Sequence, residues 1–448
     1  MSPKRLPFAI FGGLLLAAFA CHAQDLSPDK RPDPVPLSNL RAGVAKVDIT
    51  PPLGLPLAGY ADRKGPATGI HDPLHAAVIV FDDGKTRSAI VTLDVLDAGR
   101  AEGDEMQAAI AAAAAVPQDH ILINFSHTHG SPSLRRDAPW RREVIAKVAG
   151  AVQLAANRLR PVSLGYGEGA IDFNINRRVI TSDGKCIAGL NPNGICDRRV
   201  KVLRVDDGDA VAPLAVLMHA VCHANVYRMH NTEVTADFPG VAKRFVESSF
   251  GPRTTALFLQ GCSGDVRANL PGSPEGYTNE TADFGRSGNE ADMTWCGWTL
   301  GAEVLKVATR LRVREQVRRR SPSFPIAAAQ DMLGISADMD RFRAISGPRY
   351  ELRGDGGIDF PIRAMRLGDI WFVGLPGEPV VEYGLNIEKA MAGLGKVFVL
   401  GYTPGDVSYI PVARMLAEGG YEVEGGVWSK SSEREILDGV QRLVSQLR

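Results

Sequence analysis

The chain has 448 residues, of which 45% are apolar and 23% are charged. This balance is ordinary for a globular protein and excludes a disordered, collagen-like or coiled-coil chain. The 51 basic residues equal the 51 acidic ones, so the formal net charge is zero. A nucleic-acid-binding protein is therefore also excluded, because it needs a basic surface to neutralise phosphates.

The N-terminus has the pattern of a secretory signal peptide. Lys4 and Arg5 precede an apolar run at residues 8–19, and small residues up to position 23 suit cleavage before Gln24. Lipidation at Cys21 is the alternative. Residues 24–39, rich in Pro, Asp and Ser, are expected to be an extended leader, and no later apolar run is long enough to span a membrane. We expect an exported protein, periplasmic or secreted, with no transmembrane segment.

From residue 40 onward, apolar runs typical of strands alternate with helical patterns. The first strands are predicted at residues 76–80 and 88–94, and the Ala-rich stretch 101–116 is a predicted helix that ends before Pro117. Further strands are predicted at 121–125, 200–205, 214–218, 255–260, 362–366, 370–375 and 397–401, and further helices near 143–158, 241–249, 299–311, 380–394 and 433–447. The alternation predicts an α/β fold, a layered sandwich with a mixed sheet. No repeat or linker divides residues 40–448, so we expect one large domain.

Polar clusters follow three of these strands, where α/β proteins place functional groups. The first is Ser-His-Thr-His-Gly at residues 126–130. In an extended segment residues i and i+2 face the same way, so His127 and His129 are expected in one pocket. Two histidines spaced in this way are common at metal sites. The alternative is a pair of loop histidines hydrogen-bonded to the backbone.

The second and third clusters could complete such a site. Residues 218–223 read Met-His-Ala-Val-Cys-His, and their histidines are either ligands or satisfied core residues. Residues 374–378 place Glu378 on a turn after an apolar strand. A lone glutamate in a turn is usually solvated. Together with two histidines, it would give the His₂Glu set of catalytic zinc, which leaves one position open for water.

The cysteines are interpreted in the light of export, since oxidising compartments permit disulfides. Five cysteines remain once Cys21 is removed with the signal peptide. Cys186 and Cys196 bracket a short loop of Gly, Asn and Pro and form the first predicted disulfide. Cys262 with Cys296 is a second candidate, because the sequence does not fix the connectivity.

Taken together, these segments resemble the neutral (non-lysosomal) ceramidase family in its N-terminal catalytic domain. The resemblance covers roughly residues 40–424 and starts with the sequence Ala-Gly-Val-Ala-Lys-Val-Asp-Ile-Thr-Pro-Pro at 42–52. The other similar motifs follow in the family's order: Gly59-Tyr60, residues 69–71, His127-Thr128-His129, residues 174–177, His223, residues 258–260 with 264–266, residues 376–378, and the pair Tyr409 and Tyr421.

The resemblance implies a zinc ion held by four side chains: His127, His223, Glu378 and Tyr409. It also implies three catalytic residues: His129, which would hydrogen-bond the substrate, Arg177, which would orient it, and Tyr421, which would stabilise the oxyanion. A tyrosine ligand is chemically reasonable because zinc favours the phenolate over the phenol.

Two features depart from the family. Gly261 stands where the family has a serine after its Phe-x-Gln motif, and the chain is expected to lack the family's immunoglobulin-like C-terminal domain. We therefore expect a zinc-dependent hydrolase, of an amide (N-acyl) bond, that uses activated water directly. The alternatives are a hydrolase of the same fold acting on a polar glycan conjugate and a non-catalytic binding protein. A long apolar groove would favour an acyl chain, and a polar one a sugar.

Overall fold

The structure is a computed structural model that describes residues 39–61, 63–207, 212–227, 230–272, 288–313, 324–344 and 352–448. The predicted signal peptide at 1–23 and the predicted leader up to residue 38 lie outside these residues. Residues Leu37–Arg448 belong to one unit of the fold. Across the described ranges, no helix combines the length and the apolar character that crossing a membrane requires.

Most strands belong to three sheets, and each sheet has both parallel and antiparallel neighbours. The first has the order β5-β4-β3-β1-β6, with β1 (Arg41–Asp48), β3 (His75–Asp82), β4 (Arg87–Leu93), β5 (Ile121–Phe125) and β6 (Arg160–Pro161). The second has the order β13-β11-β10-β7, with β7 (Ser163–Ala170), β10 (Arg199–Asp206), β11 (Ala215–Ala220) and β13 (Thr255–Gln260). The third has the order β15-β16-β17-β19, with β15 (Ile326–Ser336), β16 (Gly357–Leu367), β17 (Ile370–Pro376) and β19 (Lys396–Thr403).

Three small sheets complete the strand pairing near the ends of the large ones. They are the pair β2 (Gly69–Ile70) and β12 (Glu233–Val234), the three strands β8 (Asn174–Ile180), β9 (Cys186–Asn191) and β14 (Val266–Ala268), and the pair β18 (Glu378–Pro379) and β20 (Tyr409–Ile410).

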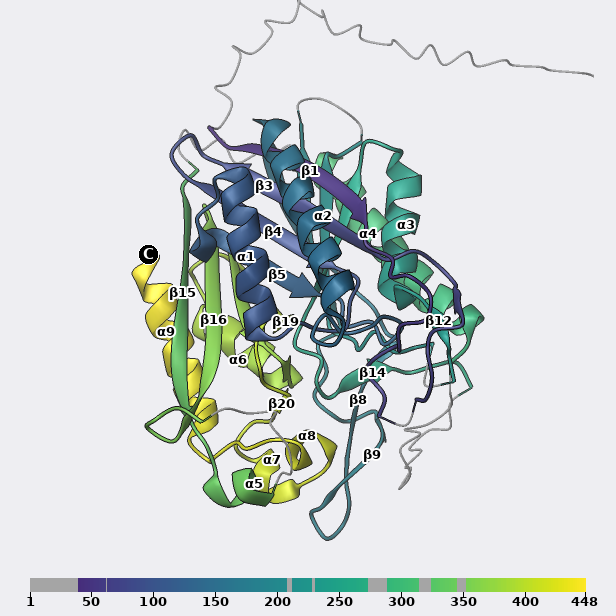
Figure 1. Cartoon of the computed structure of the whole chain (residues 1–448), viewed down its shortest axis with the longest axis vertical. Coiled ribbons are helices and arrows are strands. Elements are labelled where there is room, and N and C mark those ends of the chain that lie inside the picture. The colour runs from purple at the N-terminus through teal and green to yellow at the C-terminus, as the bar shows by residue number, and fades with distance from the viewer. Residues whose placement is uncertain are drawn as a thin grey trace, which may run out of the picture. The chain divides into compact units, whose positions relative to one another are not determined.

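Each large sheet has helices on one face and the shared core on the other. The covering pairs are α1 (Arg100–Ala114) with α2 (Ala138–Asn157) on the first sheet, α3 (Asp237–Phe250) with α4 (Glu290–Val313) on the second, and α6 (Val381–Ala390) with α9 (Ser432–Gln446) on the third. Figure 1 shows α1 and α2 lying side by side across β1, β3, β4 and β5. The short helices are η1 (Gln118–His120), α5 (Met339–Ala344), α7 (Met415–Glu418) and α8 (Tyr421–Glu424).

The opposite faces of the three sheets pack against one another. Ile79 and Leu122 of the first sheet, Leu257 of the second and Phe398 of the third belong to one buried cluster. The neighbours of Ile79 in the strand, Val78 and Val80, instead face the helices. This alternation follows from the two-residue period of a strand, which sends successive side chains to opposite faces.

Asn124 joins the three sheets at the carboxyl ends of their parallel edge strands. Its side-chain Nδ2 donates to the carbonyl oxygen of Gly401 in β19 at 2.8 Å, and its Oδ1 accepts from the backbone N–H of Gln260 in β13 at 2.8 Å. Gly261 and Leu400 form a further bridge between the second and third sheets. The loops that leave β5, β13 and β19 therefore meet in one place.

The predicted α/β class with a mixed sheet is confirmed, although the strands divide among several mixed sheets. The helix predicted near 143–158 begins earlier, at Ala138, because the Asp137 side chain accepts from the backbone N–H of Trp140 at 2.7 Å and Pro139 follows it in the first turn. The helix predicted at 380–394 ends earlier, at Ala390. The sequence prediction also missed the strands β7 to β9.

The predicted disulfide between Cys186 and Cys196 is wrong, and Cys262 and Cys296 are also separate thiols. Cys186 pairs with Ile180 at one end of β8, whereas the segment before Cys196 is held to Asn176 near the other end. Four residues of extended chain span about 13 Å. This exceeds the 4.4–6.8 Å between Cα atoms that a disulfide usually spans. The loop between the cysteines is a hairpin strand and a turn rather than a short closed loop.

Candidate metal centre

Loops from all three sheets bring four ionisable side chains together. His127 and His129 follow β5 of the first sheet, His223 follows β11 of the second, and Glu378 follows β17 of the third. Each of these strands has a parallel neighbour, and the carboxyl ends of parallel strands are where such folds place ligands. The sequence prediction that the two histidine clusters and the glutamate lie together is therefore consistent with the fold.

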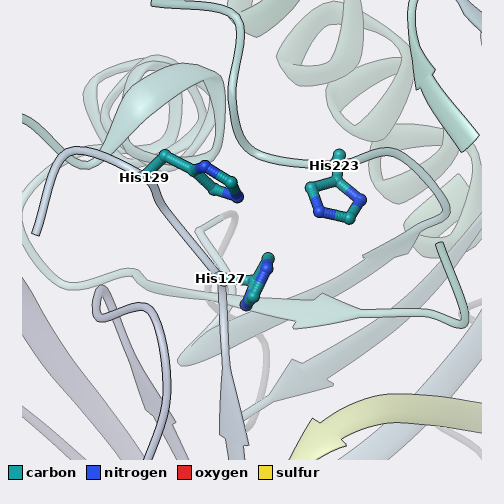
Figure 2. A group of neighbouring side chains, drawn as sticks. All are labelled: His127, His129 and His223. Carbon is teal, nitrogen blue, oxygen red and sulfur yellow. The ribbon is translucent and has the colours of Figure 1, made fainter. Parts of the chain in front are cut away.

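The three imidazole rings face a common space. Figure 2 shows His127 and His129 extending from one loop and His223 from another, with the rings turned toward one another. One ring nitrogen of each lies within 4.8 Å of those of the other two. The Oε2 atom of Glu378 is 3.2 Å from Nε2 of His127 and 3.2 Å from Nε2 of His223. All three histidines are buried.

Backbone carbonyls fix the orientation of two of these rings. His127 Nδ1 is 2.9 Å from the carbonyl oxygen of Leu96, and His223 Nδ1 is 2.9 Å from that of Ser263. Because a carbonyl only accepts, each Nδ1 is the protonated nitrogen and each Nε2 presents its lone pair to Glu378. This is the arrangement of histidines that ligate a metal.

The ring nitrogens and the carboxylate oxygen that lack hydrogen-bond partners in this cluster could bind a zinc ion. His223 Nε2, Glu378 Oε2 and both ring nitrogens of His129 are buried without a hydrogen-bond partner. Two lone pairs and a carboxylate oxygen repel one another unless a cation lies among them. Ligand atoms 2.0–2.1 Å from a tetrahedral zinc are about 3.3 Å apart, close to the separation of Glu378 from the two histidines. Histidine nitrogen and carboxylate oxygen are ligands that zinc prefers.

Burial and the charges of neighbouring groups shift the pKa values of the side chains in this cluster. Burial lowers the pKa of His129 well below its usual value, and the neighbouring histidines lower it further. Burial also lowers the pKa of His127, but the charge of Glu378 outweighs it, so that pKa is raised. Burial raises the pKa of Glu378, yet the charge of His127 and the close approach of the His127 and His223 rings bring it well below its usual value. The glutamate is therefore a carboxylate at neutral pH.

The loop of the first two histidines is strained rather than extended. His127 has a φ of 58°, in the left-handed region that residues other than glycine rarely adopt. The backbone of Gly59 packs against His129, and a Cβ at that position would lie 2.3 Å from Nδ1 of the ring. The two imidazoles thus lie close together, but through a turn and close backbone packing instead of a strand.

Two tyrosines and an arginine border the cluster on one side. Tyr409 is the strand partner of Glu378 in the small sheet of β18 and β20, and its ring stacks on His223 with centroids 6.4 Å apart. Tyr421 packs edge-on against Tyr409 and hydrogen-bonds it, and the residue is 48% exposed. The Arg177 guanidinium lies 5.3 Å from the centroid of each of these two rings. The predicted residues on this side are therefore neighbours.

A buried ion-pair network holds Arg177 in place. Glu422 accepts from Nε of Arg177 at 2.7 Å and from Nη1 of Arg178 at 2.6 Å. Arg177 also hydrogen-bonds Tyr409. Burial and the charge of Glu378 raise the pKa of Tyr409 well above its usual value, although Arg177 lowers it in part. The phenol therefore stays protonated unless a cation binds its oxygen.

Position 261 faces His219 and Val221 rather than His127, His129 or His223. A Cβ on Gly261 would meet Nε2 of His219 at 2.7 Å and Cγ2 of Val221 at 2.7 Å. His219 is a buried core residue whose Nε2 is 3.0 Å from the carbonyl oxygen of Val399, whereas its Nδ1 has no hydrogen-bond partner. A serine at 261 would thus point into the packed interior. Ser263 is fully buried, and its Oγ is 2.7 Å from Nε2 of Gln260 and 2.9 Å from the Tyr402 hydroxyl.

Sequence reasoning assigned no role to several neighbours of the site. The ring of Tyr402 lies 4.3 Å from that of His127, and its hydroxyl is 3.5 Å from Nδ1 of His223. Tyr60 packs edge-on against His129 at 4.6 Å, and Arg63 donates to the carbonyl oxygen of His129 at 2.6 Å. The end of the apolar run at 397–401 was the available signal for Tyr402. Only the family resemblance singled out Tyr60, and nothing in the sequence pattern marks Arg63.

The sequence and the fold of this chain are similar to those of known proteins. The family model for the N-terminal part of neutral/alkaline non-lysosomal ceramidases matches residues 40–298. The chain is 22% identical over 478 aligned positions to the neutral ceramidase of Mycobacterium tuberculosis, covering 88% of this chain and 74% of that protein. Its fold matches the crystal structure of neutral ceramidase from Pseudomonas aeruginosa with a TM-score of 0.71 at 17% identity, over 92% of this chain and 75% of that one. A ceramidase complexed with C2 matches with a TM-score of 0.71 at 17% identity, over 92% of this chain and 76% of that one.

Proposed function

Because the chain belongs to the neutral/alkaline non-lysosomal ceramidase family, we propose that it is an exported, zinc-dependent hydrolase of an amide (N-acyl) bond. The observation that carries this proposal is the convergence of His127 Nε2, His223 Nε2 and Glu378 Oε2, three acceptors that need a cation between them. The similarity to proteins named as neutral ceramidases supports an amide as the bond that is cleaved.

The proposed zinc ligands are His127, His223, Glu378 and Tyr409. A zinc ion in such a set lowers the pKa of a bound water to about 7 and polarises a substrate carbonyl. The carbonyls of Leu96 and Ser263 keep the first two ligands in the metal-binding tautomer. Pairing of β18 with β20 holds the other two side by side.

Three further side chains have proposed roles in binding and catalysis. His129 has both ring nitrogens available in the pocket and would hydrogen-bond the substrate amide. Arg177, held by Glu422, would orient the substrate. Tyr421 would donate its hydroxyl to the oxyanion that forms when the carbonyl is attacked, and its partial exposure leaves it accessible to substrate.

Direct attack by water is favoured over a covalent serine intermediate. Ser263 is the serine next to His223 in space, but its Oγ is fully buried and bonded to Gln260 and Tyr402. We expect Ser263→Ala to keep most of the activity and to show no acyl-enzyme burst in stopped-flow assays. Loss of several orders of magnitude in kcat, with zinc content unchanged, would instead make Ser263 the nucleophile.

The proposal is tested by metal analysis combined with hydrolysis of N-acyl amides. Purified mature protein is expected to contain about one zinc per chain and to hydrolyse N-acyl lipids, and chelated protein to recover activity when zinc is restored. His223→Ala is the matched control, because it removes a proposed ligand. Protein without metal, or His223→Ala with full zinc content, would contradict the site. Hydrolysis of glycan conjugates alone would contradict the N-acyl substrate.

A further inference from the structure

Arg267 is a buried arginine beside the proposed metal centre. None of the roles proposed above involves it. It is the middle residue of β14, and only 4% of it is exposed. The residue before it, Val266, accepts a backbone hydrogen bond from the N–H of His223 at 3.0 Å. Arg267 itself is paired in register with Ile175 of β8, two residues before Arg177. β14 therefore lies between the His223 loop and the strand of the proposed substrate-orienting arginine.

The two neighbours of Arg267 in β14 point into apolar clusters. Val266 packs with Val221 and Val381, and Ala268 belongs to the core of the second sheet. Successive side chains of a strand leave opposite faces, so Arg267 leaves the other face of β14. A charge at this depth is costly unless an acceptor meets it.

The Arg267 guanidinium does not use all of its N–H groups in hydrogen bonds. Its Nε donates to the carbonyl oxygen of Ala268 at 3.3 Å, and its Nη1 is buried without a partner. Among the residues that the structure describes, no carboxylate forms an ion pair with Arg267. The nearby acids are already engaged: Glu422 bonds Arg177 and Arg178, and Asp265 accepts from Asn176 Nδ2 and from the backbone of Val381. Within the described part of the chain, Arg267 thus lacks the carboxylate partner that Glu422 provides for Arg177 and Arg178.

We propose that Arg267 is a specificity-determining residue that binds an anionic group of the substrate, a carboxylate on the amine part of an N-acyl amide. A buried guanidinium with unused N–H groups matches the two oxygens of a carboxylate. The acyl part of an N-acyl lipid is hydrocarbon next to its carbonyl, so a charge close to the scissile bond belongs to the amine. The substrate class is therefore an N-acyl amino acid. This inference rests on the proposed function for the cleaved bond.

Binding of two probes without an amide bond tests the subsite independently of hydrolysis. Dodecyloxyacetate carries a carboxylate, and 2-(dodecyloxy)ethanol is its neutral counterpart of similar length. Titration calorimetry on the zinc-loaded wild type is expected to show at least tenfold tighter binding of the carboxylate. Arg267→Met should lose most of that preference, and Arg267→Lys should keep part of it. Arg198→Met, which removes an equal charge from an exposed side chain, should behave as wild type.

Kinetics with matched substrates separate the subsite from the proposed function. N-lauroylglycine is expected to have a higher kcat/KM than N-lauroylethanolamine, and Arg267→Met to raise KM for the first only. Binding preference without hydrolysis of either substrate would overturn the proposed function and leave the subsite supported. Equal binding of both probes by the wild type would overturn the subsite, whatever the variants do. Preference retained in a folded Arg267→Met would also overturn it, since the anion would then be bound by another group.

Discussion

At the scale of single residues, the proton positions of the histidines determine what the cluster can bind. The carbonyl of Leu96 holds the proton of His127 on Nδ1, and the carbonyl of Ser263 does the same for His223. Both Nε2 lone pairs are thereby directed at Glu378 before any ion arrives. A ligand set arranged in advance loses little conformational entropy on binding, which favours retention of the metal.

The same geometry predicts different roles for Glu378 and His129, and substitutions can distinguish these roles. Glu378→Gln replaces a carboxylate by an amide and should lower zinc content strongly, because it removes the negative charge at the convergence of the two Nε2 atoms. His129→Gln should keep the zinc and lose activity, since His129 is proposed to contact substrate. Elemental analysis and kcat of the two variants measure this. If His129→Gln loses zinc and Glu378→Gln keeps it, the three histidines are the ligand set.

The two tyrosines should respond differently to loss of a hydroxyl. Tyr421→Phe is expected to lower kcat about 10²–10³-fold, typical of one missing oxyanion donor, with little change in KM or zinc content. Tyr409→Phe should weaken zinc retention itself, because it removes a proposed ligand next to Glu378 in register. Parallel measurement of kcat and metal content distinguishes the roles. The reverse pattern would exchange the two assignments.

At the scale of elements, the sequence predicted best what lies next to a strong local pattern. The strands β5 and β17 are apolar runs whose ends can be recognised in the sequence. The histidines follow the first of these runs, and Glu378 follows the second. Arg267 could not be found in this way, because its significance comes from strands that the fold brings together. The Cys186–Cys196 prediction failed because the intervening residues form a strand and a turn, which hold the thiols apart along β8.

The side chain of Asn124 connects strands of the three sheets, and its removal should lower the free energy of unfolding. Asn124→Leu keeps the branching at Cγ but removes the hydrogen bonds to the N–H of Gln260 and the carbonyl of Gly401. Each unsatisfied group costs about 1–3 kcal/mol, so the free energy of unfolding should fall by several kcal/mol. Denaturant unfolding measures this change.

Asn157→Leu is the matched control for that experiment, because Asn157 is exposed at the end of α2. It should change the free energy of unfolding by less than about 0.5 kcal/mol. Equal stability of the Asn124 and Asn157 variants would show that the junction of the three sheets does not depend on the Asn124 side chain.

At the scale of the whole molecule, the proposed ligands come from all three sheets. His127 belongs to the loop after β5, His223 to the loop after β11, and Glu378 to the loop after β17. Apolar packing holds the sheets together on their inner faces, whereas the loops at their carboxyl ends converge on buried acceptors. A cation at that point would therefore link the three sheets as well as serve the chemistry.

This linkage predicts that zinc stabilises the entire fold. A ligand that binds only the folded state at 1,000 times its Kd adds about 4 kcal/mol to the free energy of unfolding. Chelation should therefore lower the Tm of the wild type by several degrees, and added zinc should restore it. His223→Ala should melt at the same temperature with and without the chelator, because it has lost a ligand. A wild-type Tm that is unchanged by complete removal of zinc would mean that the loops keep their arrangement without the ion and that its role is confined to chemistry.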